Sequence, residues 1–206
     1  MNFHEPTRRF EEELCRYTGA PFAIAVDNMS NALWLCLMYH NVKGLQVHIP
    51  KHTYPSVPQE IIMAGGKVKF YDSPKYLTGK YQLAPFPIWD SALHFTADMY
   101  VPNQFICISF TGAYKHLKLG KGGAILTDNK EAYEWFKRGR NSGRGECSYH
   151  DDTFTMISRN CYMHPMVSAL GCQLIQQFYK LDGSKKHNED ASLPYPDLSQ
   201  FEIFTQ

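Results

Sequence analysis

A basic, glycine-rich stretch directly after an apolar run is the first candidate for chemistry. The run is "FICISF", and the stretch "YKHLKLGKGG" at 114–123 holds three lysines, one histidine and three glycines. Such a turn can cradle a phosphate, place one lysine as a covalent catalyst, or form only a solvated hairpin. A lysine becomes nucleophilic when desolvation or nearby positive charge lowers its pKa, and His116, Lys118 and Lys121 supply part of such a field to Lys115.

Two further polar groups follow apolar segments. In "VDNMSNAL" a strand passes through a short turn into a helix, so free N–H groups and the Ser30 hydroxyl form either an anion site or a plain N-cap. In "IWDSA" Asp90 ends an apolar strand. A carboxylate there needs a partner, which is a cationic ligand nitrogen, a metal or a backbone N–H.

The surrounding pattern predicts alternating helices and strands. Phe10, Leu14 and Tyr17 recur at helical spacing, which predicts an opening helix closed by Gly19. The other expected helices are 30–40, 57–66, 129–140 and 164–180, and the expected strands are 22–26, 45–50, 67–72, 86–90, 105–110 and 122–128.

This alternation predicts a three-layer α/β/α fold around a mostly parallel, mixed central sheet. In such sheets, ligands bind beyond the carboxyl ends of the strands. Polar residues gather at the predicted ends, at 27–30, 52–54, Asp90 and 109–115. The fold class and the candidate residues therefore point to the same edge of the sheet.

Composition argues against several classes of function. The chain has 206 residues and a formal net charge of +1, so no bulk attraction to nucleic acid or membrane is expected. Its six cysteines share no CxxC spacing, which is typical of reduced thiols. The charged opening is unlike a signal peptide, and the run "ALWLCLMY" is far short of the ~20 residues that span a bilayer. We expect a cytoplasmic protein without a metal site.

Together the candidate residues make up the set that pyridoxal 5'-phosphate (PLP) needs. An aspartate pairs with the pyridinium nitrogen, a lysine forms the Schiff base, an aromatic ring stacks on the pyridine, and a helix start with a serine binds the phosphate. Asp90, Lys115, Tyr54 and Ser30 are of these types. The combination is more specific than any one of them.

The chain resembles the DegT/StrS-type family of PLP-dependent sugar aminotransferases, of the aspartate aminotransferase fold (type I). The resemblance rests on four stretches that occur in the family's order across about residues 8–180. They are "FEEELCRYTGAPFAIAVDNMSNALWLCL", "VHIPKHTYPSVPQEIIMAGGKVKFYD", "KHLKLGKGGAILTDNKEAYEWFKRGRNSGR" and "NCYMHPMVSALGCQLIQQF".

The resemblance implies a role for each matching position. Lys115, fixed by the glycines at 120–123, matches the Schiff-base lysine, and Asp90 matches the pyridinium partner. Tyr54 matches the stacking ring. Asn160 matches an asparagine that reaches the phosphate of a neighbouring subunit, which implies a homodimer. The remaining cofactor-binding positions implied are Met29, Ser30 and Ser109. Leu93 stands where the family has glutamine or histidine, and the adjacent His94 is the candidate for that role.

This chain also departs from the family pattern. The link between 67–72 and 86–90 is short, one residue is inserted between Ser109 and Lys115, and Tyr162 stands where the family has arginine. The family's small C-terminal domain has no counterpart, so we expect a PLP-binding domain at 1–182 and a C-terminal arm at 183–206.

The resemblance implies transamination of a keto nucleotide-sugar, with glutamate or glutamine as the amino donor. Two alternatives stay open. PLP-dependent sugar dehydratases of the same family carry histidine in place of the lysine, and His116 is adjacent to Lys115. A chain without a substrate domain is also compatible with a non-catalytic PLP-binding or regulatory partner of a full-length relative.

Overall fold

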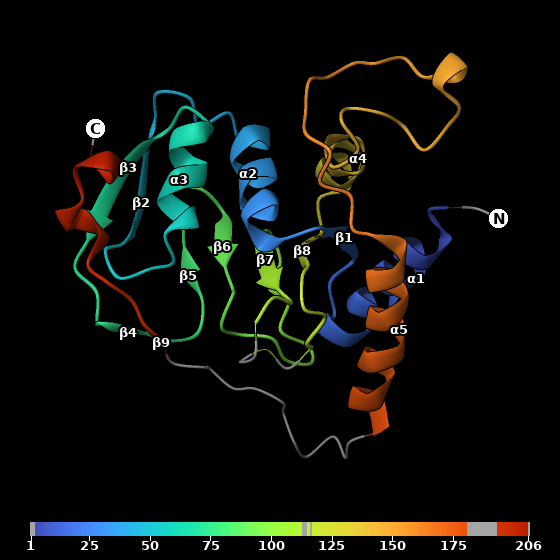
Figure 1. Ribbon diagram of the computed structural model, residues 1–206, viewed down its shortest axis with the longest axis horizontal. Coiled ribbons are helices and arrows are strands. Elements are labelled where there is room, and N and C mark those ends of the chain that lie inside the picture. Colours follow the sequence, from blue (N-terminus) through green and yellow to red (C-terminus); the bar gives the residue numbers. More distant parts are fainter. Residues whose placement is uncertain (1–2, 113–114, 116, 181–192, 206) are drawn as a thin grey trace.

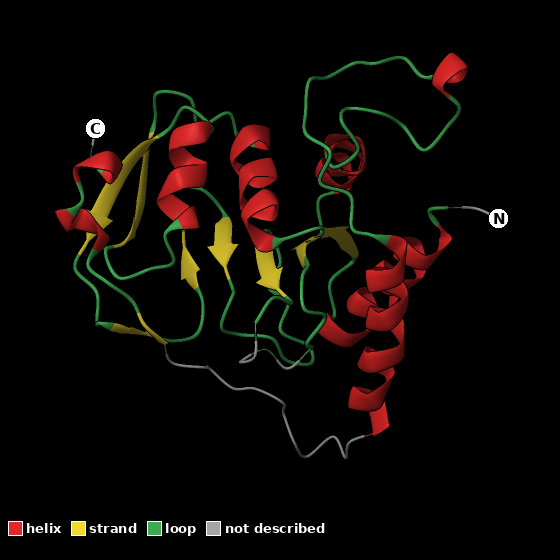
Figure 2. Ribbon diagram, in the orientation of Figure 1, coloured by secondary structure: helices red, strands yellow, loops and turns green. Residues whose placement is uncertain are grey.

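The computed structural model describes residues 3–112, 115, 117–180 and 193–205 (Figures 1 and 2). The helices are α1 (Glu5–Thr18), α2 (Met29–Tyr39), α3 (Ser56–Met63), α4 (Lys130–Gly139) and α5 (Pro165–Lys180), with the 3-10 turns η1 (Tyr149–Asp151), η2 (Leu198–Gln200) and η3 (Glu202–Phe204). The strands are β1 (Phe22–Val26), β2 (Gln46–Pro50), β3 (Lys67–Tyr71), β4 (Tyr76–Leu77), β5 (Tyr81–Gln82), β6 (Ile88–Asp90), β7 (Phe105–Ser109), β8 (Gly123–Thr127) and β9 (Leu193–Pro194).

The main sheet is mixed and has the order β1-β8-β7-β6-β5. Strand β8 runs antiparallel between β1 and β7, β6 is parallel to β7, and β5 is antiparallel to β6. Three of the five strands, β1, β7 and β6, therefore run in one direction. Their carboxyl ends meet at one edge of the sheet, which is where the sequence predicts a site.

Helices cover both faces of this sheet, which confirms the predicted α/β class. Ile24 and Val26 of β1 pack into a core with α2, α3 and α4, whereas Ala23 and Ala25 face a second core with α1 and α5. This alternation follows from the two-residue period of a strand. Figure 1 shows α2 and α3 side by side on one side of the strands, with α1 and α5 together at the end near β1.

A small parallel sheet of β2 and β3 extends the fold beyond β5. An isolated bridge between His48 and Ala84 joins the two sheets. The segment 193–205 packs on this part of the chain: β9 pairs with β4, the Leu198 N–H donates to the Lys51 carbonyl at 2.8 Å, and Leu198 and Phe204 are buried. The segment therefore folds back on its own chain.

The ends of the helices follow the local chemistry that the sequence predicts. Gly19 ends α1 in the left-handed region at φ 77°, where glycine meets no Cβ penalty. The Asn28 side chain accepts from the Asn31 N–H at 2.9 Å and caps α2, and Asn129 caps α4 in the same way. The predicted long elements are confirmed; the two-residue strands β4, β5 and β9 lie outside the prediction.

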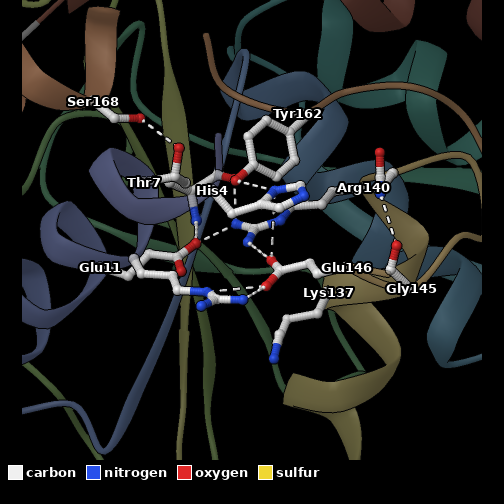
Figure 3. A network of polar contacts seen from close by, with 12 residues as sticks. His4, Thr7, Glu11, Lys137, Arg140, Gly145, Glu146, Tyr162 and Ser168 are labelled. Carbon is white, nitrogen blue, oxygen red and sulfur yellow. Dashed lines mark hydrogen bonds and ion pairs between the residues drawn. The ribbon is translucent and has the colours of Figure 1, made fainter. Parts of the chain in front are cut away.

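A buried charge network ties α1 to the end of α4 (Figure 3). The Arg140 side chain is fully buried; its guanidinium donates to Glu11 and to the Ala25 carbonyl at 2.9 Å, and pairs with Glu146 at 3.3 Å. The Tyr162 ring lies 4.7 Å from its central carbon. Although burial opposes it, the hydrogen bond from Arg8 and the charge of Arg140 hold the pKa of Glu146 below its usual value. The network fixes α1 against the sheet.

No helix in the described part of the chain is long and apolar enough to cross a membrane.

Candidate active site

A cavity of about 450 Å³ opens at the carboxyl ends of β1, β6 and β7. This volume lies within the range of small-molecule sites, about 300–1,000 Å³. Its lining brings together six of the predicted residues: Met29, Ser30, Tyr54, Asp90, Ser109 and Lys115. Other lining residues are Asn28, Ser56, Thr111, Leu193 and Tyr195.

Lys115 supplies the amine of this cavity. Its side chain is partly buried, and Nζ donates to the Ala92 carbonyl, next to Asp90. Burial lowers the pKa of Lys115, and the negative charge of Asp90 opposes that shift. Burial therefore moves the amine toward the neutral form that acts as a nucleophile.

The glycines after Lys115 let β8 begin directly under the start of α2. A Cβ on Gly123 would lie 2.6 Å from the Met29 nitrogen, so only glycine fits there. Gly122 has a φ of 141°, which also favours glycine. Leu117 and Leu119 are buried, whereas Lys118 and Lys121 are exposed. The loop thus turns Lys115 into the cavity and leaves the other two lysines in solvent.

Asp90 supplies a carboxylate at the end of β6. It is buried, with 5% of its surface exposed. Oδ1 accepts from the Ala92 N–H at 2.9 Å, and Oδ2 accepts from the Tyr81 hydroxyl at 2.9 Å. Burial raises the pKa of Asp90, while the Ala92 N–H, the Tyr81 hydroxyl and the charge of Lys115 oppose that rise.

Asp90→Asn is expected to stabilise the protein in the absence of added ligand. Because the folded pKa of Asp90 lies above its unfolded value, ionisation costs stability as pH rises through the folded pKa. The free energy of unfolding that Asp90→Asn gains over wild type is therefore largest above the pKa of Asp90 in the folded protein. It disappears below the pKa of Asp90 in the unfolded chain. Urea unfolding at pH 4–8 measures it.

The exposed Asp98→Asn is the matched control, since Asp98 sits at φ 53°, a conformation that asparagine tolerates. It should leave the unfolding midpoint unchanged. A lower free energy of unfolding for Asp90→Asn at pH 8 would contradict the account of Asp90.

One part of the cavity lining is suited to an anion. Helix α2 begins there at Met29, and helix N-termini present free N–H groups and a positive dipole end. The Ser30 hydroxyl donates to the Ser56 hydroxyl at 2.8 Å, and the Ser109 hydroxyl accepts from the Thr111 N–H at 3.3 Å. Ser30 lies in the first turn of α2, Ser56 begins α3 and Ser109 ends β7.

Two aromatic rings form the outer wall. Tyr54 is 57% exposed and lies edge-to-face with Tyr195, with ring centroids 6.4 Å apart. Burial, together with Asp90 and Tyr54, raises the pKa of Tyr195 to about 12, so its hydroxyl stays protonated. Sequence reasoning missed Leu193, Tyr195 and Tyr81; the only local signal was the "LPYP" motif and the alternation in "KYQL" before "IWD".

The structure does not bring every predicted residue into this cavity. His94 is outside the lining, and its carbonyl accepts from the Ser91 hydroxyl at 2.8 Å. Asn160 is exposed and forms an isolated bridge with Asn141. His116, the basis of the dehydratase alternative, lies outside the described residues.

Comparison with known proteins gives one family match. The sequence profile of the DegT/DnrJ/EryC1/StrS aminotransferase family matches residues 2–79 and 102–198. The match includes the positions of Met29, Ser30, Tyr54, Ser109 and Lys115. It leaves out 80–101, the segment that carries Tyr81 and Asp90.

The similar proteins are longer than this chain. One is the UDP-4-amino-4,6-dideoxy-N-acetyl-beta-L-altrosamine transaminase of Campylobacter jejuni, 23% identical over 88% of this chain and 58% of its own length. A second is Helicobacter pylori PseC, an aminotransferase of pseudoaminic acid biosynthesis, with a TM-score of 0.67, 15% identity and coverage of 84% and 57%. A third is the GDP-4-keto-6-deoxymannose-3-dehydratase ColD, with a TM-score of 0.66, 15% identity and coverage of 87% and 62%. The chain thus spans about three fifths of the length of each.

Proposed function

The chain belongs to the DegT/DnrJ/EryC1/StrS aminotransferase family, and from that premise we propose that it is a PLP-dependent aminotransferase. Its substrate would be a keto nucleotide-sugar, with glutamate or glutamine as the amino donor. The single observation that carries the proposal is the convergence of an amine, Lys115, and a buried carboxylate, Asp90, on one cavity that the start of α2 also lines.

The residues present fit PLP by chemical type. Lys115 provides the primary amine that would join the aldehyde, and Asp90 provides the acceptor for a protonated ring nitrogen. The start of α2 with Ser30, Ser109 and Thr111 provides donors for the phosphate. Tyr54 provides an aromatic surface at the cavity wall. When bound, PLP supplies an electron sink for the carbon that loses its proton.

Asp90 and Lys115 would act in the reaction itself. Asp90 would hold the ring nitrogen protonated, since a carboxylate there favours the cationic ring. Lys115 Nζ would act as the base that takes the proton from the α-carbon of the amino donor, and in the second half of the reaction as the acid that gives a proton to the sugar carbon that receives the nitrogen. The low polarity around Lys115, seen in the direction of its pKa shift, favours this exchange at neutral pH.

The role proposed for Asp90 does not depend on the family profile, which leaves out 80–101. It rests on geometry: β6 is parallel to β7, so the carboxyl end of β6 lies beside the segment that carries Lys115.

A homodimer, in which Asn160 reaches the partner's phosphate, and a cytoplasmic location remain part of the proposal. So does the division into a PLP-binding domain at 1–182 and an arm at 183–206.

Product analysis tests the reaction. The protein, PLP and L-glutamate are incubated with a 4-keto-6-deoxy nucleotide-sugar, and the product is identified by mass spectrometry. Transamination replaces the keto oxygen by an amino group. A sugar that gains no amino group, with either glutamate or glutamine as donor, would contradict the proposal.

A dehydratase is the second candidate, and its support is the fold likeness to ColD together with His116 beside Lys115. The same product analysis separates the two, because dehydration removes an oxygen without adding nitrogen. The third candidate is a non-catalytic PLP-binding partner of a longer relative. Turnover by the isolated chain would contradict it.

A further inference from the structure

Tyr81 lies directly opposite Asp90 in the antiparallel pair of β5 and β6. Residues paired in this way place their side chains on the same face of a sheet. Both side chains are buried. Tyr81 lies in the segment that the family profile does not match, so the sequence comparison assigns it nothing.

A chain of hydrogen bonds with a fixed direction runs through Tyr81. Its hydroxyl donates to Asp90 Oδ2 at 2.9 Å and lies 2.6 Å from the Thr53 hydroxyl. A phenol has one proton, and Tyr81 gives it to Asp90, so Thr53 must be the donor to Tyr81. Thr53 is itself buried, at 1% exposure. The three residues come from the loop after β2, from β5 and from β6.

We propose that Tyr81, oriented by Thr53, is a positioning residue that keeps the Asp90 carboxylate ionised and aimed into the cavity. The inference rests on the proposed function, because an ionised Asp90 matters for a protonated ring nitrogen. Burial favours the neutral acid, which cannot hold that nitrogen protonated. A hydrogen bond to a charged acceptor is among the stronger ones, so its loss should be measurable.

Other titratable groups act near this carboxylate. The positive charge of Lys115 favours the ionised form of Asp90, and the negative charge of Asp90 helps to raise the pKa values of Cys107 and Tyr195. The Ala92 N–H also donates to it. Because Tyr81→Phe leaves all of these in place, the variant isolates the contribution of one hydroxyl.

The first test measures Asp90 without any cofactor. Carboxyl ¹³C NMR of aspartate-labelled protein gives the titration of Asp90, assigned by the signal that Asp90→Asn removes. In Tyr81→Phe the titration midpoint should move to higher pH. Thr53→Ala should move it in the same direction by less, and Thr53→Ser should restore it. An unchanged midpoint in Tyr81→Phe overturns the proposal.

The second test uses PLP as the probe. Below the pH at which Asp90 titrates, the Kd of PLP should rise about tenfold in Tyr81→Phe. The neutral acid must lose its proton before it can hold the ring nitrogen, and loss of a hydrogen bond to the charged form makes that step less favourable by roughly that factor or more. The acid limb of the plot of Kd against pH should move to higher pH. Tyr100→Phe is the matched control, since the Tyr100 hydroxyl donates to the Gln104 carbonyl at 3.2 Å, outside the cavity.

The role of Tyr81 and PLP binding by the protein are tested separately by these measurements. If wild-type protein binds PLP and Tyr81→Phe binds it equally well at every pH, the inference is wrong and the proposed function stands. If wild-type protein does not bind PLP, the proposed function is wrong; a shifted Asp90 titration would then still support the hold of Tyr81 on Asp90.

Discussion

Lys115→Ala is expected to abolish covalent attachment of PLP. Wild-type protein treated with PLP and then borohydride should carry the pyridoxyl phosphate mass on the peptide that contains Lys115, and the variant should carry none. Amino transfer should fall by on the order of 10³-fold or more, because general acid–base catalysis alone contributes about 10²–10⁴. Peptide mapping by mass spectrometry measures the first effect, and the rate of product formation measures the second.

The glycine-rich loop offers matched controls within six residues. Lys118→Ala and Lys121→Ala remove exposed lysines, and both variants should be labelled like wild type. Lys115→Arg keeps the positive charge beside Asp90 but has no amine that condenses with the aldehyde under these conditions. It should therefore lose the label while retaining fold and charge. Label on the peptide of Lys118 or Lys121 in wild type would contradict the assignment.

Arg140→Met is expected to be the most destabilising single substitution in the buried charge network. Arg140 is fully buried and pairs with Glu11 and Glu146. Its removal leaves the buried Glu11 carboxylate without a counter-charge, whereas Glu146 keeps its pair with Arg8. Breaking a buried pair in this way typically costs about 3–5 kcal/mol. Burial already raises the pKa of Glu11 despite the arginine. Urea unfolding at pH 7.5 measures the loss.

A surface pair on α1, the helix that carries Glu11, provides the control. Arg9 pairs with Glu5 at 2.8 Å, and both side chains are largely exposed. Arg9→Met should cost less than about 1 kcal/mol, as exposed ion pairs do. The double variant Arg140→Met/Glu11→Gln should recover part of the loss, since it removes one uncompensated charge and keeps the acceptor for the Ala25 N–H. A loss below about 1 kcal/mol in Arg140→Met would contradict the role given to the network.

The architecture and the location of the site were predictable because they follow from local pattern. Apolar strands with a two-residue period and helices with clear caps determine which strand ends meet. That reasoning placed Asp90 at a strand end even though the family profile passes over its segment. The family resemblance singled out Lys115 as the Schiff-base lysine among the three lysines of the loop. The structure agrees, since Lys118 and Lys121 are exposed and Lys115 is partly buried.

The supporting contacts were not predictable, because they join residues that only the tertiary fold brings together. Strand β5 has two residues, too few for a period, yet it carries the tyrosine that holds Asp90. Thr53 reaches Tyr81 across 28 positions, and Arg140 reaches Glu11 across 129. Tyr195 comes to the cavity only through the pairing of β9 with β4.

The visible absorption spectrum of the purified protein with PLP tests the central claim most directly. PLP joined to Lys115 should give an absorption band that free PLP lacks, and L-glutamate should remove that band as the amino group passes to the cofactor. Lys115→Ala should show no such band. A wild-type spectrum equal to that of free PLP, or a band unchanged in Lys115→Ala, would contradict the account.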